Sequence, residues 1–348
     1  MKHLIFLILS AISINALGWN TSSIENIREE AFYDEETDLH FLYYGKDTHK
    51  CIVVDGIIYY PFDTWTLYHG EKFEIPSKVI NDGEEFEVVG IHPMAFWMCD
   101  MKYLSFPPTL RFIGYNCFES CYNLETLIFN EGLETIGYNS FNELDKITEI
   151  TLPNSLFKIE NNCFSRCPNL TKINFGKGLT IIEEGAFCNN EKLLEVEVPE
   201  YARSGRLGLS GAFNNNPSLR KVTIGKWAAH DFLESCFNGC PEIEVIICHS
   251  ADPEGFRNCF DAVDKEKCIV YVPDGAISRY LRAPGWNEFN LREISSMSST
   301  PEIDIDDNDD TTEVYNLQGI KLNSTSNDGS INIIRNKQDG NCIKVLKK

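Results

Sequence analysis

The stretch Cys117-Phe118-Glu-Ser-Cys121-Tyr-Asn-Leu124-Glu-Thr-Leu127-Ile-Phe129 returns, with changes, as Cys163-Phe164-Ser-Arg-Cys167-Pro-Asn-Leu170-Thr-Lys-Ile173-Asn-Phe175. The phenylalanine in second place marks a repeat, and these marker phenylalanines are Phe96, Phe118, Phe141, Phe164, Phe187, Phe213, Phe237 and Phe260. Successive markers are 22, 23, 23, 23, 26, 24 and 23 residues apart. Neither a helix bundle nor a β-sandwich explains a register that persists over so many copies.

The residues around each marker keep their chemical character. Five residues before the first five markers lies an isoleucine, at Ile91, Ile113, Ile136, Ile159 and Ile182. The residue directly before the marker is small, at Ala95, Cys117, Ser140, Cys163, Ala186, Ala212, Cys236 and Cys259. Positions nine and eleven after it are apolar, as in Leu127/Phe129, Ile150/Leu152, Ile173/Phe175, Val196/Val198 and Val222/Ile224.

A fixed period in the twenties is typical of a leucine-rich-repeat solenoid. Two apolar residues separated by one polar residue indicate a short strand, while the residues from the marker to the following leucine fit one or two helical turns. Each repeat is therefore predicted to form one coil with a short strand, a turn and a helical or irregular return. Strands of successive coils would stack in parallel about 4.8 Å apart, and both ends of the stack would need caps.

Composition and charge exclude some classes of partner. The 348 residues are 43% hydrophobic and 24% charged, which is an ordinary globular composition. The formal net charge is −21, and a surface of that sign repels phosphate backbones, so no nucleic-acid partner is expected. The charge would suit a cationic partner or serve the solubility of an exported protein.

The amino terminus reads as a signal peptide. A basic start, Met1-Lys2-His3, precedes a short apolar run that ends in Ala16-Leu17-Gly18. The run is shorter than the roughly 20 residues of a membrane span, so cleavage after Gly18 would leave a mature chain without a transmembrane segment. No cysteine lies just beyond Gly18, which argues against lipoprotein anchoring.

Thirteen cysteines would normally indicate disulfides in an exported chain. Eight of them occupy only two repeat positions, directly before the marker and three residues after it: Cys99, Cys117, Cys121, Cys163, Cys167, Cys236, Cys240 and Cys259. Other copies place Ala, Ser, Leu or Asn there, so the positions require a small buried group, and buried free thiols are predicted. Zinc ligation by the C-x₃-C pairs is the alternative, but no histidine shares their period.

The rest of the chain divides by composition. Residues 19–50 lack the repeat, and Ile24–Phe32 fits a short amphipathic helix or a disordered leader. Residues 51–90 alternate strand-like segments with turns and are predicted to cap the first coil. The solenoid with its carboxy-terminal cap then spans 91–294, an acidic flexible linker 295–312, and a small β tail 313–348.

One interval between markers is longer than the others and holds the enlarged loop Glu200–Gly211. Insertions in solenoids lie on one face, often the binding face. Tyr201, Arg203 and Arg206 in this strongly acidic protein make the loop a candidate contact site. A neutral difference in loop length is the alternative.

The repeats, of the form Ile-Gly-x-x-(Ala/Cys)-Phe-x-x-Cys-x-x-Leu, resemble BspA-like leucine-rich repeats of secreted and surface proteins. Cys268-Ile-Val-Tyr271-Val272-Pro273 with Tyr280, Trp286 and Phe289 is similar to the closing coil of that family. Val314–Gly319 and the strands after it resemble a carboxy-terminal segment of exported Bacteroidetes proteins, which implies a possible sorting role. The resemblance implies surface exposure and, in some members, adhesion to host or bacterial proteins.

No constellation of residues points to catalysis, a cofactor or a metal site. The seven histidines do not form H-E-x-x-H, and the chain has no Gly-rich phosphate loop or G-x-S-x-G elbow. The run Asp304–Asp310 has calcium-loop spacing but lacks the turn glycine and the distal glutamate, so it reads as linker. The sequence favours an exported binding or adhesion module that recognises a protein or glycan ligand with one solenoid face, and the alternative is a structural scaffold in a bacterial surface assembly.

Overall fold

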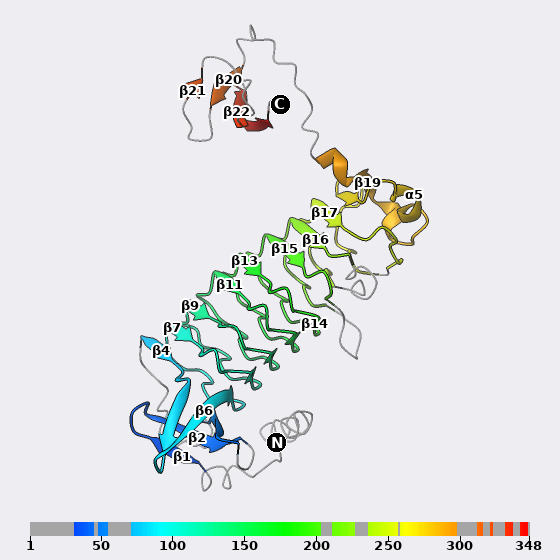
Figure 1. Ribbon diagram of the computed structural model, residues 1–348. Coiled ribbons are helices and arrows are strands. Elements are labelled where there is room, and N and C mark those ends of the chain that lie inside the picture. The colour runs from blue at the N-terminus through cyan, green and yellow to red at the C-terminus, as the bar shows by residue number, and fades with distance from the viewer. Residues whose placement is uncertain are drawn as a thin grey trace. The chain divides into compact units, whose positions relative to one another are not determined.

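The computed structural model describes residues 31–44, 48–54, 71–202, 211–226, 236–256, 258–297, 312–315, 321–322, 331–336 and 342–346. The chain divides into two compact units, Met1–Glu293 and Ile294–Lys348. The first unit holds all eight marker phenylalanines (Figure 1). The predicted signal peptide at 1–18 and residues 298–311 of the predicted linker lie outside the described residues.

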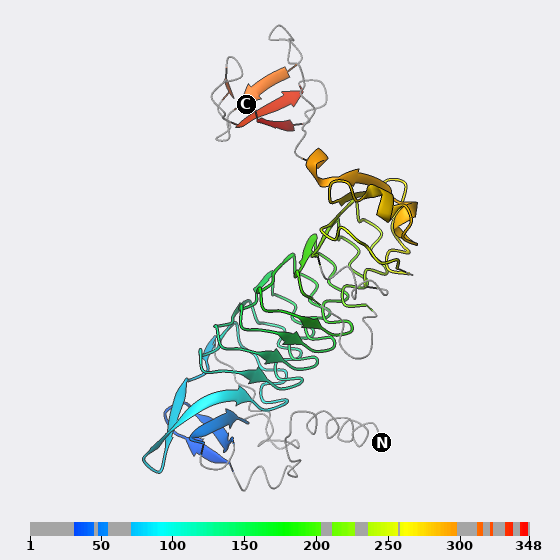
Figure 2. The same cartoon turned by 45° about the vertical axis from the view of Figure 1, so that its right-hand side comes forward.

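The repeats form a solenoid whose successive coils pair through parallel strands, which confirms the predicted fold class (Figures 1 and 2). The strands that follow the markers, with one strand before the first coil and one after the last, form three parallel sheets of three, two and five strands, which together we call the long-strand face. Its members are β4 (Lys72–Glu74), β7 (Tyr103–Ser105), β9 (Thr126–Ile128), β11 (Glu149–Thr151), β13 (Lys172–Asn174), β15 (Glu195–Val198), β16 (Lys221–Ile224), β17 (Val245–Cys248), β18 (Ile269–Val272) and β19 (Asn290–Glu293).

A second ladder contains the isoleucines that lie five residues before the markers. It is made of β6 (Glu84–Ile91), β8 (Phe112–Ile113), β10 (Thr135–Ile136), β12 (Lys158–Ile159) and β14 (Ile181–Ile182), which pair in parallel. Each of these isoleucines is buried. Two strand ladders and the turn around the marker thus enclose one continuous core.

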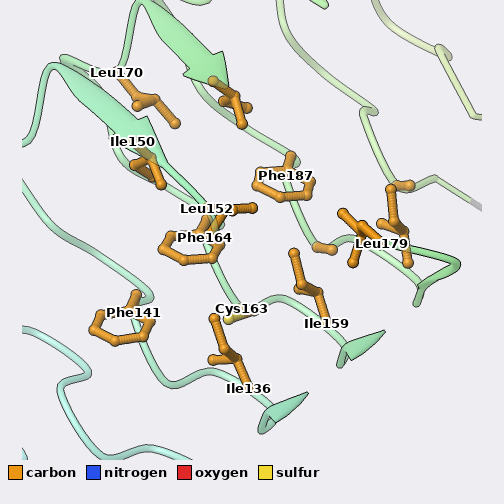
Figure 3. Close-up of a cluster of buried hydrophobic side chains, with 14 of the residues drawn as sticks. Ile136, Phe141, Ile150, Leu152, Ile159, Cys163, Phe164, Leu170, Leu179 and Phe187 are labelled. Carbon is orange, nitrogen blue, oxygen red and sulfur yellow. The ribbon is translucent and has the colours of Figure 1, made fainter. Parts of the chain in front are cut away.

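The eight marker rings form one uninterrupted stack along the core. Neighbouring ring centroids are 5.1–5.5 Å apart and neighbouring planes are inclined by 3–10°. Figure 3 shows Phe141, Phe164 and Phe187 in this stack, with Ile136 and Ile159 beside it. Phe187 and Phe213 stack at 5.4 Å although the enlarged loop lies between them in sequence, so the insertion leaves the core register unchanged.

The return of each coil is a series of turns, so the helical alternative is wrong. In almost every coil the residues two before and two after the marker have positive φ. They are Met94, Asn116, Asn139, Asn162, Gly185, Gly211 and Asn258 before it, and Met98, Ser120, Glu143, Arg166, Asn189, Asn215 and Gly239 after it. A right-handed helix cannot contain such left-handed residues. Asparagine and glycine at many of these positions keep the cost of this conformation low.

This turn geometry directs backbone N–H groups at the next coil. The marker N–H donates to the carbonyl of the residue before the next marker, as from Phe118 to Ser140 at 2.8 Å and from Phe164 to Ala186 at 2.8 Å. A turn of this kind cannot satisfy its hydrogen bonds alone, so each coil depends on its neighbour.

The cysteine positions are also hydrogen-bond positions. All twelve cysteines whose side chains are described are buried and free, which confirms the prediction of buried thiols. Three residues after the marker, the Sγ of Cys121 donates to the Phe96 carbonyl at 3.3 Å, and the Nδ2 of Asn190 donates to the Phe164 carbonyl at 3.1 Å. Cysteine and asparagine thus fill this buried position as small donors in most coils, while Leu144 and Val263 fill it without donating.

Both ends of the stack are capped. At the amino end, β1 (Phe32–Asp34), β2 (Leu39–Tyr43) and β3 (Lys50–Val53) extend the second ladder, and β5 (Lys78–Asn81) pairs antiparallel with β6 through an Asp82-Gly83 turn with positive φ at both residues. Two corrections follow. Phe32, which the sequence left in a helix or a leader, begins a cap strand, and Phe73 belongs to the long-strand face because β4 pairs with β7.

At the carboxy end, α5 (Ile277–Tyr280) and the 3₁₀ turn η1 (Trp286–Glu288) cover the last coil, and a second 3₁₀ turn, η2 (Ile294–Met297), follows β19. Tyr280 and Trp286 are fully buried; the Tyr280 hydroxyl donates to the Ser250 carbonyl at 2.8 Å and the Trp286 Nε1 to the Glu254 carbonyl at 3.0 Å. The second unit contains β20 (Thr312–Tyr315), β21 (Lys321–Leu322), β22 (Ile331–Asn336) and β23 (Cys342–Leu346) in the antiparallel order β21-β20-β22-β23. This is the predicted small β unit, in which the segment from Val314 to Lys321 contributes to two short strands, β20 and β21.

Candidate binding surface

The outward side of the long-strand face is the surface that the repeat leaves free to vary. Alternate strand residues point inward and are buried, such as Ile150 and Ile173, while their neighbours point to solvent. Strand register aligns the outward residues in two rows that cross the coils. Packing of the coils requires only that the inward residues be apolar. The choice of the outward residues is therefore not determined by the fold.

In the middle coils these rows are polar and partly ion-paired. Glu149 and Thr151 of β11 lie beside Lys172 and Asn174 of β13. The Lys172 ammonium is 3.1 Å from the Glu149 carboxylate. Exposed pairs of this kind contribute little to stability, about 0–1 kcal/mol. We call β11 and β13 the polar half of the face.

Beyond the two intervening coils of β15 and β16, the same rows become apolar. Val245 and Ile247 of β17 lie beside Ile269 and Tyr271 of β18, and all four occupy outward positions. Val245, Ile269 and Tyr271 are half-buried, while Ile247 between them is only 8% exposed. We call these four residues the apolar patch.

Cationic and polar side chains border the apolar patch. Lys221 and Thr223 of β16 lie beside Val245 and Ile247, and Asn290 and Arg292 of β19 lie beside Ile269 and Tyr271. One basic residue, Lys221 or Arg292, thus lies on each side of the patch. An apolar centre with a charged rim is the arrangement that protein interfaces use.

A groove opens next to the patch on the side of β16. Its volume is about 550 Å³, and its lining consists of Leu194, Glu195, Pro217, Ser218, Arg220, Lys221 and Glu242. Leu194 is 46% exposed, and Arg220 is exposed. Since Lys221 belongs both to this lining and to the rim of the patch, the two features are continuous.

The candidate contact loop is described only in part. Tyr201 is 47% exposed, just after β15, and the next residue, Ala202, is buried. Arg203 and Arg206 lie outside the described residues. Sequence reasoning overlooked the apolar patch, although a signal existed. Val245-Ile-Ile-Cys248 and Ile269-Val-Tyr-Val272 are unbroken apolar runs, whereas Glu195-Val-Glu-Val198 and Lys221-Val-Thr-Ile224 alternate.

The described residues contain no arrangement typical of a metalloenzyme. Within these ranges, no group of three or more histidine, cysteine, aspartate or glutamate side chains is placed to hold a metal ion. Cys248 and His249 are adjacent in sequence and have the residue types of a nucleophile and its base. Cys248 is buried, however, and burial raises the pKa of its thiol, which disfavours the thiolate that a nucleophilic cysteine needs. No helix in this part of the chain has the length and apolar character needed to cross a membrane.

Comparison with known proteins identifies the repeat. The family model described as the BspA type leucine-rich repeat region, in six copies, matches residues 89–205. No curated protein matches the chain. The match covers the coils from Phe96 up to the enlarged loop, and the same ring stack and strand pairing continue beyond it to Phe260.

Similar solved structures are bacterial leucine-rich repeat proteins. A leucine-rich cell surface protein of Faecalibacterium prausnitzii A2-165 is 15% identical over 74% of this chain and 87% of its own, with a TM-score of 0.43. A leucine-rich repeat protein of Bacteroides ovatus ATCC 8483 is 19% identical over 70% of each chain, with a TM-score of 0.36. Residues 89–205 of this chain are therefore BspA-type leucine-rich repeats.

Proposed function

We propose that this protein is exported and binds a partner protein through the apolar patch, as an adhesion-type module. The observation that carries the proposal is the change along one face: the outward rows are polar over β11 and β13 and apolar over β17 and β18. Solenoids use such extended faces for recognition. Nothing in the packing of the coil requires Ile269 or Tyr271 to be apolar, because neither points inward.

The chemistry of the partner follows from the surroundings of the patch. Half-buried aliphatic side chains and one tyrosine suit an apolar or aromatic contact from the partner. Arg220, Lys221 and Arg292 next to it suit carboxylates, although Lys221 is also paired with Glu195 at 3.0 Å. The partner that fits best is therefore a protein surface with an apolar centre and an acidic rim.

Export rests on the sequence at the amino terminus, and adhesion rests on the family. The signal-peptide pattern at residues 1–18 supports release from the cytoplasm. The repeat family supports a role at the cell surface. A structural scaffold within a surface assembly is the competing role, and it would use the same face on an envelope partner.

The test is a binding screen of the protein against matrix proteins, mucins, envelope proteins and glycans. The patch variant Ile269→Lys/Tyr271→Asn copies the outward residues of β13, and the matched control Lys172→Ser/Asn174→Ser changes the equivalent positions of the polar half. A third variant, Arg203→Glu/Arg206→Glu, tests the enlarged loop. We expect a protein partner whose binding falls at least about tenfold in the patch variant and persists in the control.

Three other outcomes would contradict the proposal or change the role assigned to the patch. Binding that is lost only in the loop variant would move the site to the enlarged loop and overturn the patch. Binding to glycans alone would refute the proposed partner class. Saturable binding only to envelope proteins, through the patch, would favour the scaffold role.

A further inference from the structure

Three buried amide oxygens in the described part of the chain have no hydrogen-bond partner: the Oδ1 atoms of Asn116, Asn139 and Asn142. Asn116 is 1% exposed and Asn142 is 4% exposed. Buried polar atoms are almost always hydrogen-bonded, since leaving one unpaired costs about 1–3 kcal/mol. All three oxygens belong to two neighbouring coils, which indicates one shared cause.

The repeat places these residues side by side. Asn116 and Asn139 each lie two residues before a marker, and Glu119 and Asn142 each lie one residue after the same two markers. Backbone hydrogen bonds from Asn116 to Tyr138 at 2.8 Å and from Ser120 to Asn142 at 2.9 Å hold the two coils in register. Within the first coil, the Asn116 Nδ2 donates to the Glu119 Oε2 at 2.5 Å, so the two positions are in contact. The four residues therefore occupy two matching repeat positions in two successive coils, and we call them the amide block.

Glu119 supplies the block with a carboxylate that the protein leaves poorly compensated. Burial and the nearby Glu143 raise its pKa from 4.5 to about 7, against the opposing effects of Asn116 and Arg166. Arg166 is committed elsewhere, since its Nη1 lies 3.2 Å from the Glu143 carboxylate. Glu143 also accepts a hydrogen bond from the Ser120 hydroxyl at 3.1 Å. Glu143 thus has an ion pair with Arg166, whereas the direct partner of the Glu119 carboxylate is the neutral Asn116 amide.

The unpaired acceptor oxygens of the block indicate which kind of ligand it would bind. Three amide oxygens and a carboxylate are all acceptors, and one water molecule can donate only two hydrogen bonds to them. Hard oxygen ligands of this kind suit Ca²⁺, which binds carboxylate and amide oxygens at about 2.3–2.6 Å. Neighbouring coils are about 4.8 Å apart, close to twice that bond length. An ion between the coils would therefore reach oxygens of both.

We propose that Asn116, Glu119, Asn139 and Asn142 form a calcium site that joins the coils of Phe118 and Phe141. The site contains one carboxylate and three amide oxygens. It therefore differs from the groups of three or more histidine, cysteine, aspartate or glutamate side chains that the described residues lack. It is also separate from the acidic run Asp304–Asp310. The ion would bind to oxygens already held in place by the fold, and the proposal is independent of the apolar patch.

The test uses the full chain, treated with a chelator and then titrated with Ca²⁺ alone by calorimetry. Terbium is a second probe, because Trp97 lies in the coil before Glu119 and next to it: the Met98 N–H donates to the Glu119 carbonyl at 2.9 Å. We expect one saturable site, tryptophan-sensitised terbium emission that Ca²⁺ displaces, and a rise in the midpoint of thermal unfolding with Ca²⁺.

Two variants locate the ion. Glu119→Gln keeps the shape of the side chain and should weaken Ca²⁺ binding at least about tenfold and remove the sensitised emission. Glu183→Gln is the matched control, because Glu183 is also partly buried with a pKa raised by burial, but no orphaned amide oxygen lies beside it. Binding that survives in Glu119→Gln would assign the ion to another place, such as Asp304–Asp310. Absence of saturable binding in the unmodified protein would mean that several waters fill the block, and either result overturns the proposal.

Discussion

Strands β11 and β13 and strands β17 and β18 cover the same kind of core but present opposite surfaces. Beneath both pairs, marker rings stack at 5.1–5.5 Å, and the inward strand residues are buried. Outward, the first pair carries Glu149 and Lys172 where the second carries Val245 and Ile269. The core of a solenoid coil and its surface are therefore specified by separate positions.

This separation explains why function is hard to infer from the repeat. The inward residues, the marker and the left-handed turn residues satisfy the requirements of stacking, and they are alike from coil to coil. The outward residues satisfy no such requirement. An apolar outward residue such as Ile269 stays partly exposed to water unless a partner covers it, and for this reason the apolar patch supports the proposed binding role.

The largest expected effect tests the claim that the two regions share one core. Phe164→Ala beneath the polar half and Phe237→Ala beneath the apolar patch each remove a fully buried ring from the stack. Each should lower the free energy of unfolding by about 3–5 kcal/mol, the usual result of emptying an aromatic core site. Urea denaturation followed by circular dichroism measures both. A cost at one site but not the other would break the comparison, and no cost at Phe164 would mean that the repeat register is misread.

The next effect concerns the turn, where coils use different donors three residues after the marker: Cys167 in the coil of Phe164, Asn190 in the coil of Phe187 and Cys240 in the coil of Phe237. Asn190 is fully buried; its Nδ2 donates to two marker carbonyls and its Oδ1 accepts from the Cys167 N–H at 2.8 Å. In the C-terminal region the equivalent Cys240 donates only its thiol proton, to the Phe213 carbonyl at 3.3 Å. Asn190→Ala should cost about 1–3 kcal/mol, because it leaves buried backbone groups unpaired.

Cys240→Ala should cost less than Asn190→Ala in the same urea titration. Burial raises the pKa of the Cys240 thiol to about 12, so the group stays protonated as a weak donor. Asn190→Cys is the control, since cysteine occupies this position in other coils, and it should recover part of the lost stability. Equal costs for both alanine variants would show that volume, and not hydrogen bonding, decides the residue there.

Much of the fold could be predicted from sequence, because stacking imposes a period. The marker spacing predicted the coils, the apolar pair after the leucine predicted the long-strand face, and the aromatic residues near Trp286 predicted the carboxy-terminal cap. The form of the return was missed. Positive φ at Asn116 or Asn139 follows from hydrogen bonding between coils, and a single coil read as a sequence shows only residues that also fit a helical turn.

The candidate sites were less accessible to sequence reasoning. Tyr201, Arg203 and Arg206 were selected because an insertion is visible in a repeat, whereas the apolar patch is visible only after register shows that Val245 and Ile269 are neighbours. The amide block has no motif at all. It is recognised by three unpaired amide oxygens, and these can be identified only from the hydrogen bonds of the folded coils.

The third effect depends on pH. It compares two residues directly after a marker, Glu119 in the coil of Phe118 and Asn238 in the coil beneath the apolar patch. Burial and Glu143 raise the pKa of Glu119 to about 7, against Asn116 and Arg166, so the folded state binds its proton more tightly than the unfolded state. Its contribution to stability is therefore full below about pH 4.5 and is lost as pH rises through about 7.

Glu119→Gln should remove that loss. In a chelating buffer, the variant should exceed the unmodified protein in free energy of unfolding by about 1–2 kcal/mol more at pH 8 than at pH 5, after allowance for the part of the carboxyl that stays in water. Urea titrations at both pH values measure the difference, in which the other titrating groups largely cancel. A difference that does not change with pH would contradict the raised pKa.

The smallest effect is the sharpest test of the separation between core and surface. Val245→Glu/Ile269→Lys transfers the Glu149–Lys172 pair to the equivalent positions of β17 and β18. Exposed ion pairs and outward aliphatic residues each contribute little to stability, so the free energy of unfolding should change by less than about 1 kcal/mol. Binding of a partner through the patch should nevertheless be lost, because the graft replaces its apolar centre with charges. A large loss of stability would instead mean that the patch is part of the core, and its apolar character would then be explained without any partner.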